Sequence, residues 1–268
     1  NSKKDKRLQR YICARLACIP GWSMGYGFDL WEWVDEKMLN NWHDYMHSHM
    51  GWKHYLGARS DNNEYNQISE KMDYSSYELH KYAEPQPWYR QWVKVVNERS
   101  DEPAFSEDRF RVRGKYPKKD VTIEETRRGL YYATMAGGAA SIWGYLKYGD
   151  GEYKSGGRSF EYPNKEQIKT WSVFFDEKKR FLKDMVRAND LSNGYVLHSP
   201  STKSYVVYHE NTKSINLEMK VSGKVPVIAV NTKRAYKEID LGNHSSGKHT
   251  FELSEKSDWV VAVGTFDE

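Results

Sequence analysis

The sequence predicts an α/β domain whose parallel strands close into a (β/α) barrel, followed by a small antiparallel β-sandwich. Up to about residue 190, short apolar strands alternate with amphipathic helices, and this unit recurs five times. Several of these strands end in charged or aromatic residues. Beyond residue 194 the pattern changes to short alternating runs separated by turn residues. The 268-residue chain therefore has two expected domains, residues 1–190 and residues 191–268.

The elements follow from hydrophobic periodicity and from the Gly, Pro, Asn and Ser residues between the periodic segments. The helices are expected at residues 7–18, 35–50, 88–99, 122–136 and 165–188. The strands of the first domain are expected at Trp22–Phe28, His54–Arg59, Ser75–His80, Ala104–Ser106 and Ala139–Gly144. The sandwich strands are expected at Tyr195–His198, Ser204–His209, Ser214–Met219, Val225–Asn231, Lys237–Leu241, His249–Leu253 and Trp259–Phe266.

A closed barrel is favoured over an open doubly wound sheet by the residues at the strand ends. In a barrel the carboxyl ends of all strands converge on one site. No glycine-rich phosphate loop of the GxGxxG type opens any of the expected helices, although a doubly wound nucleotide-binding domain would carry one. The polar or aromatic residues at the strand ends are Asp29, Arg59, His80, Glu107 and Trp143.

Composition excludes several classes of function. Charged residues make up 29% of the chain, mean hydropathy is -0.88, and no apolar run approaches the roughly 20 residues of a membrane-spanning helix. A net charge of +4 is too small and too dispersed for a nucleic-acid-binding protein. The 10 Trp and 20 Tyr supply flat amphipathic rings, which stack on sugars or pack helices against a sheet.

Three short segments carry a resemblance to a known family. The run Pro103–Glu107 resembles the seventh strand of clan A glycoside hydrolases, which have a TIM-type (β/α)8 barrel. Residues Arg127–Ala139, leading to Ile142–Gly144, resemble the last helix and strand of apiosidase-like barrels. The C-terminal Asp258–Phe266 is similar to the final strand of the collagen-binding-type β-sandwich that often follows such barrels.

The resemblance implies that only the C-terminal half of the barrel is present. Trp22–Asp29 then corresponds to strand four, and the chain carries about strands four to eight. Four or five barrel strands expose an apolar sheet edge, so we expect this chain to be a fragment or to be completed by another polypeptide.

The same resemblance implies a pair of catalytic carboxyl groups, because glycosidic cleavage needs one group to protonate the leaving oxygen and one to attack or stabilise the sugar. Glu107 matches the nucleophile on strand seven. The acid/base would be Asp29 or Glu32, although the family's usual Asn-Glu or Gly-Asp pair is absent from Gly25–Glu32. Glu78 is a third candidate.

A structural role for Glu107 remains open, because basic residues follow it closely and could pair with it. Arg109, Arg111 and Arg113 are the nearest of a basic run that extends to Lys119. Such a run either binds an anionic polysaccharide through bidentate contacts or is a solvated loop. The expected substrate-binding residues are Arg59, Tyr77, His80, Arg109 and Trp143.

Four histidines fall within twelve residues, and two of them, His43 and His47, lie one helical turn apart. A pair of this spacing is found in zinc sites, but the stretch from His43 to His47 lacks the glutamate of the zincin pattern and no third ligand can be placed. The sequence therefore predicts neither a metal nor a cofactor.

The expected function is a retaining glycoside hydrolase that acts on a plant or algal polysaccharide, with an anionic glycan as one option. The alternatives are a non-catalytic carbohydrate-binding protein on a degenerate barrel, and a polysaccharide lyase with a Tyr or His base. No apolar segment follows the N-terminal charges, so no secretory signal is recognised. A secreted, periplasmic or cell-surface location follows only from the substrate class.

Overall fold

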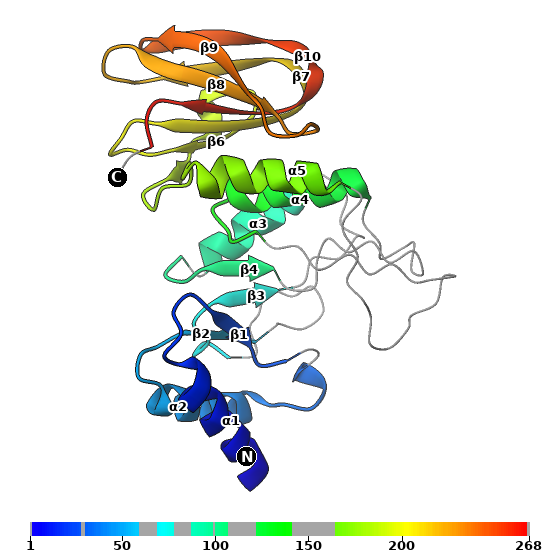
Figure 1. The fold of residues 1–268 in the computed structure, drawn as a ribbon, viewed down its shortest axis with the longest axis vertical. Helices are drawn as coiled ribbons and strands as arrows, with labels where there is room; N and C mark the ends of the chain where they lie inside the picture. The colour runs from blue at the N-terminus through cyan, green and yellow to red at the C-terminus, as the bar shows by residue number, and fades with distance from the viewer. Residues whose placement is uncertain are drawn as a thin grey trace. The chain divides into compact units, whose positions relative to one another are not determined.

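A computed structural model describes residues 2–27, 30–58, 69–77, 87–98, 100–106, 122–140 and 164–266 (Figure 1). The helices are α1 (Lys3–Leu16), α2 (Glu36–His49), α3 (Pro87–Glu98), α4 (Ile123–Met135) and α5 (Lys165–Ser172), with short helical turns η1 (Leu30–Glu32), η2 (Val173–Glu177) and η3 (Asn189–Leu191). The strands are β1 (Ser23–Gly25), β2 (Tyr55–Gly57), β3 (Ser75–Tyr77), β4 (Ala104–Ser106), β5 (Val186–Arg187), β6 (Tyr195–His198), β7 (Tyr205–Met219), β8 (Val225–Asn231), β9 (Glu238–His244) and β10 (Gly247–Val263).

Contacts along the chain divide it into two compact units. The N-terminal unit comprises Asn1–Phe110 and Gly138–Trp143, and the C-terminal unit comprises Arg111–Gly137 and Gly144–Glu268. Helices α4 and α5 thus group with the C-terminal strands. The division into domains after residue 190 stays a prediction.

The N-terminal unit contains two parallel strand pairs. β1 pairs with β2, with Met24 opposite Leu56, and β3 pairs with β4, with Ser76 opposite Phe105. α2 lies between β1 and β2, and α3 lies between β3 and β4, so both parallel pairs are connected by crossovers. The predicted parallel α/β alternation is confirmed for these strands.

One backbone hydrogen bond joins the two pairs, and another links β4 to the segment after α4. The Asp73 amide, two residues before β3, donates to the Leu56 carbonyl of β2 at 3.0 Å. The Ala139 amide donates to the Ala104 carbonyl of β4 at 2.8 Å. Each strand thus lies beside the next one in sequence, which is the order of a (β/α) barrel, whereas the order of a doubly wound sheet reverses once. Closure of the barrel stays a prediction.

Local side chains explain where three of the helices begin. The Ser2 hydroxyl accepts from the Asp5 amide at the start of α1, and Thr122 accepts from the Glu125 amide at the start of α4. In both cases the acidic side chain bonds back to the capping residue's amide, which completes a capping box. The Asp35 carboxylate caps α2 through the Met38 amide at 2.7 Å.

Two glycines of the N-terminal unit make room for buried aromatic rings. A Cβ atom on Gly57 would lie 2.3 Å from the Tyr74 ring, and one on Gly138 would lie 2.7 Å from the Trp92 ring. Trp92 is completely buried. At these positions any side chain would overlap a ring that cannot move away, because protein cores are close-packed.

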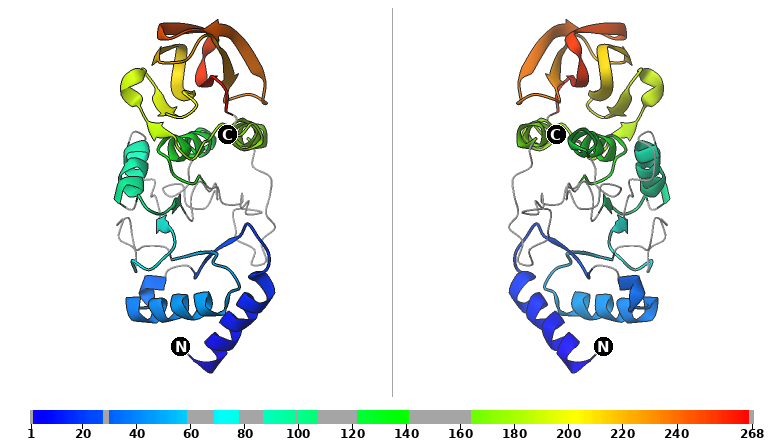
Figure 2. Two further views of the ribbon diagram at one scale, coloured as in Figure 1. Left: turned by 90° about the vertical axis from the view of Figure 1, so that its left-hand side faces the viewer. Right: turned by 90° about the vertical axis from the view of Figure 1, so that its right-hand side faces the viewer.

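The C-terminal unit is built on one antiparallel sheet of six strands, in the order β5-β6-β7-β10-β8-β9. The sheet is strongly curled (Figure 2) and encloses an apolar core that includes Val207, Leu217, Phe251 and Trp259. The predicted antiparallel pattern is confirmed. Two separate packed sheets are not confirmed, because the described strands form a single sheet.

Some boundaries in the C-terminal unit differ from the sequence prediction. The runs 204–209 and 214–219 form one strand, β7, and the runs 249–253 and 259–266 form most of another, β10. Their pairing shifts register between Glu252 and Ser257, so a bulge absorbs the polar residues that the sequence presents as a turn.

The expected helix at residues 165–188 is also shorter than predicted. α5 ends at Ser172 and continues as a π-helical turn to Glu177. Lys179 then adopts a left-handed conformation with φ of 49°, which ends the helix. The apolar periodicity continues because Phe174, Phe175 and Leu182 are buried on both sides of this break.

Within the C-terminal unit, α4 packs on the curled sheet (Figure 1). The Tyr131 ring of α4 stacks on the Tyr208 ring of β7 with centroids 4.6 Å apart. Arg187 of β5 donates to the Ala136 carbonyl at the end of α4, at 2.6 Å. These contacts anchor the C-terminal half of the helix on the sheet.

A buried carboxylate of the sheet also connects it to α4. Asp258 of β10 is completely buried and accepts from Arg127 of α4 at 2.6 Å and from Arg128 at 2.8 Å. The Asn211 amide donates to it at 2.9 Å. Burial acts to raise the pKa of Asp258, but the two guanidinium groups and the amide outweigh it and lower that pKa to about 2.

Candidate functional site

The carboxyl ends of the parallel strands are where the sequence places a catalytic site. Tyr77, the last residue of β3, lies opposite Ser106, the last residue of β4. Glu107 directly follows Ser106 in the sequence. Glu32 is the last residue of η1, the turn that follows β1, and it is exposed to solvent.

Most of the expected site residues lie outside the described residues. These are Asp29, Arg59, His80, Glu107, Arg109 and Trp143. The separation of Glu107 from Asp29 or Glu32, which distinguishes retaining from inverting hydrolysis, is therefore not defined. The catalytic and substrate-binding roles stay predictions.

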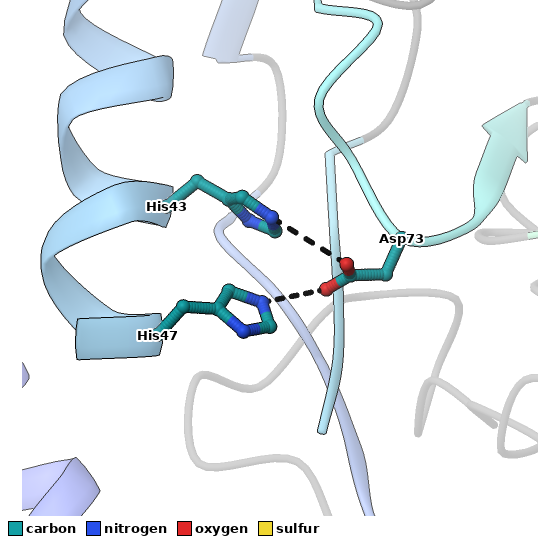
Figure 3. Close-up of side chains that lie close together, drawn as sticks. All are labelled: His43, His47 and Asp73. Carbon is teal, nitrogen blue, oxygen red and sulfur yellow. Dashed lines mark hydrogen bonds and ion pairs between the residues drawn. The ribbon is translucent and has the colours of Figure 1, made fainter. Parts of the chain in front are cut away.

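A second group of polar side chains is fully described. His43 and His47 on α2 both point their Nε2 atoms at the carboxylate of Asp73 (Figure 3). His47 Nε2 lies 2.8 Å from Asp73 Oδ2, and His43 Nε2 lies 3.5 Å from Asp73 Oδ1. The side chains of His43, His47 and Asp73 are 8%, 11% and 26% exposed. The three residues thus form a compact, largely buried cluster.

Neighbouring groups orient this cluster. The Tyr26 hydroxyl lies 3.2 Å from His43 Nδ1, and the Leu56 amide donates to Asp73 Oδ2 at 2.9 Å. Burial acts to raise the pKa of the Asp73 carboxyl, but hydrogen bonds from His43, Leu56 and His47 outweigh it and leave that pKa below its ordinary value. Asp73 is therefore ionised at neutral pH.

The spacing of the two histidines is visible in the sequence, whereas nothing in the sequence connects Asp73 with them. This residue lies 26 positions after His47, and only the hydrogen bonds between its backbone and β2 bring it beside α2. The other two histidines of the sequence group point elsewhere. His49 is exposed and bonds to the Tyr45 carbonyl, whereas His54 is buried against Trp22, with ring centroids 4.1 Å apart.

His54 also lines a pocket of about 500 Å³ at the amino ends of β1 and β2. Trp52 donates to His54 Nε2 at 2.9 Å and is 55% exposed. An exposed indole of this kind offers an apolar face and a polar edge. The other lining residues are Pro20, Gly21, Trp22, Ser23, Lys53 and Tyr55.

The structure is similar to solved glycoside hydrolases. One protein described as a glycoside hydrolase superposes with a TM-score of 0.66 at 13% identity, over 99% of this chain and 69% of its own. A glycoside hydrolase family 5 protein from Bacteroides vulgatus gives 0.68 at 14% identity, over 99% of this chain and 66% of its own. A GH30 endoxylanase from Clostridium papyrosolvens gives 0.57 at 10% identity, over 99% of this chain and 72% of its own.

This likeness establishes the fold class, since these neighbours are TIM-barrel glycoside hydrolases. The chain spans about two thirds of the length of the first two neighbours. No model of a known protein family matches the sequence, and no curated protein sequence matches it significantly. Among the described residues, none of the helices has both the length and the apolar character to cross a membrane.

Proposed function

We propose that this chain is the C-terminal part of a retaining glycoside hydrolase, with Glu107 as the nucleophile and Asp29 or Glu32 as the acid/base. The observation that carries the proposal is the order of the parallel strands, each beside the next, in a fold shared with glycoside hydrolases. Glu107 directly follows the carboxyl end of one of these strands, where barrel enzymes keep their catalytic residues.

The proposed chemistry has two steps. The acid/base protonates the leaving glycosidic oxygen while the Glu107 carboxylate attacks the anomeric carbon and forms a glycosyl-enzyme ester. A water molecule, deprotonated by the same acid/base, then attacks the anomeric carbon and releases Glu107. Tyr77, at the end of the strand that pairs with β4, would lie next to the nucleophile and position it.

The residues after Glu107 bear on the kind of polysaccharide that is bound. The basic run after Glu107 favours a polysaccharide that carries carboxylate or sulfate groups, because Arg binds such groups bidentately. Arg59, His80, Arg109 and Trp143 would contact that substrate. The β-sandwich label for the C-terminal sheet, secretion, and the supply of the other barrel strands by another polypeptide stay predictions.

A single substitution tests the catalytic role. Glu107→Gln keeps the size of the side chain but removes the nucleophile, so sugar release from a panel of neutral and uronic polysaccharides should fall by at least about 1,000-fold. Binding of the same polysaccharides, measured by affinity electrophoresis, should be unchanged. Glu98→Gln is the matched control, because Glu98 is an exposed carboxylate of α3 paired only loosely with Lys94, at 3.6 Å.

The same assay separates the alternatives. Binding without sugar release in the unmodified chain would indicate the carbohydrate-binding protein instead of an enzyme. Products that absorb in the near ultraviolet as unsaturated uronides would identify a lyase. Equal activity of Glu107→Gln and Glu98→Gln would refute Glu107 as the nucleophile.

A further inference from the structure

We propose that His43, His47 and Asp73 bind a divalent transition-metal ion of the zinc type, and that this ion ties α2 to the segment leading into β3. The site is independent of the proposed hydrolase function. Asp73 lies at the amino end of β3, whereas Glu107 follows the carboxyl end of β4. The ion would therefore stabilise the N-terminal unit and take no part in glycosidic cleavage.

The ligand atoms have the arrangement that such an ion needs. His43 and His47 are four residues apart on one helix, so their side chains lie on the same face, one turn apart. One ring nitrogen of each histidine and one carboxylate oxygen of Asp73 all lie within 4.8 Å of one another. Neighbouring ligands of a tetrahedral zinc ion, with bonds of about 2.1 Å, are about 3.4 Å apart. The two nitrogen–oxygen separations of 2.8 and 3.5 Å bracket that value.

The groups around the cluster hold two of the ligands in place. A metal-binding imidazole usually donates its other N–H to an oxygen, and the Tyr26 hydroxyl is 3.2 Å from His43 Nδ1. The Leu56 amide, by donating to Asp73 Oδ2, orients the carboxylate. Both partners come from the strand segments next to α2, so the site is held by the unit's core and not by a loop.

Charge and exposure also fit a bound cation. Asp73 supplies one negative charge that is only partly buried, and the nearby Asp44 carboxylate is engaged by Lys71 at 2.7 Å. Two imidazoles and one carboxylate form a donor set that suits zinc and its neighbours in the first transition row. With Asp73 26% exposed, a water molecule can reach the fourth position.

The test is zinc binding by the whole chain after treatment with a chelator, followed by isothermal titration calorimetry. We expect one tight zinc ion per chain, and His47→Gln should weaken its binding by at least about 100-fold. Tyr26→Phe should weaken it by about 10-fold, because it removes only the orienting partner of His43. His49→Gln is the matched control, since His49 lies on the same helix but is exposed and outside the cluster.

Two results would overturn the proposal: no zinc binding by the unmodified chain above the level of the His47→Gln variant, or an equal loss in His47→Gln and His49→Gln. If circular dichroism shows that His47→Gln does not fold, the unmodified chain with ¹⁵N-labelled histidine gives the answer. Zinc should then shift the Nε2 resonances of His43 and His47. Shifts confined to other histidines would contradict the site.

Discussion

The buried carboxylate of Asp258 should be the strongest single polar contribution to the C-terminal unit. It is completely buried and receives hydrogen bonds from Arg127, Arg128 and the Asn211 amide. The Asp258→Asn substitution keeps the shape but removes the charge, which leaves the Arg127 guanidinium, 3% exposed, with only the more distant Glu124 carboxylate, at 3.9 Å. Breaking a buried pair in this way costs about 3–5 kcal/mol. The lowered pKa of about 2 for Asp258 corresponds to a stabilisation of the same order, about 2–3 kcal/mol.

We therefore expect Asp258→Asn to lower the free energy of unfolding of the C-terminal unit by about 3 kcal/mol. Hydrogen-exchange mass spectrometry at increasing urea concentrations measures this for peptides from α4 and β10 separately. Glu218→Gln is the control, because Glu218 pairs with Lys248 at the surface at 3.5 Å, and such pairs contribute under about 1 kcal/mol. Equal protection of α4 and β10 in the two variants would show that the buried pair does not hold the helix on the sheet.

Three further predictions concern single groups. Because the pKa of Asp258 is lower in the folded state than the ordinary 3.8, the unfolded chain takes up the proton first. The free energy of unfolding of the C-terminal unit should accordingly fall as the pH drops from about 4 to about 2. Asp258→Asn should remove part of this dependence in acid-unfolding curves, because Asp184 of the same unit also has a pKa lowered to about 2. Tyr131→Phe should raise the free energy of unfolding by about 1 kcal/mol in urea titrations, because the buried Tyr131 hydroxyl has no hydrogen-bond partner among the described residues; a loss of stability would mean that the hydroxyl is satisfied. Gly138→Ala should destabilise the N-terminal unit by about 1–3 kcal/mol in thermal unfolding, because its Cβ would overlap the Trp92 ring, whereas Gly51→Ala, with no atom within 4 Å of the new Cβ, should be neutral.

The sequence by itself determined the local elements wherever their signals are local. Asp35 and Thr122 each mark a helix start through a bond to an amide three residues on, so the observed starts of α2 and α4 lie within one residue of those expected. The first helix, in contrast, begins at Lys3, behind the capping residue Ser2, four residues before its expected start at residue 7. The boundaries of β4, β6 and β8 agree with the prediction for a similar reason, because each is an apolar run flanked by turn residues.

Long-range pairing decided what the sequence could not. The polar residues between the two halves of β10 have the composition of a turn, yet hydrogen bonds to β7 keep them within one bulged strand. A strand's continuation depends on its partner, which is many residues away, so local composition carries no signal of it. The same reason explains why the helix expected up to residue 188 ends early and β5 joins the sheet instead.

The functional residues divide in the same way. The sequence indicated Glu107 through its position after a strand, and it identified the His43 and His47 pair through its helical spacing. Only the tertiary structure brought Asp73 to those histidines across 26 residues, and Asp258 to Arg127 across 131. A cluster of this kind forms when separate elements pack together. The distances in sequence between its residues follow no fixed period, so no sequence pattern reveals the cluster.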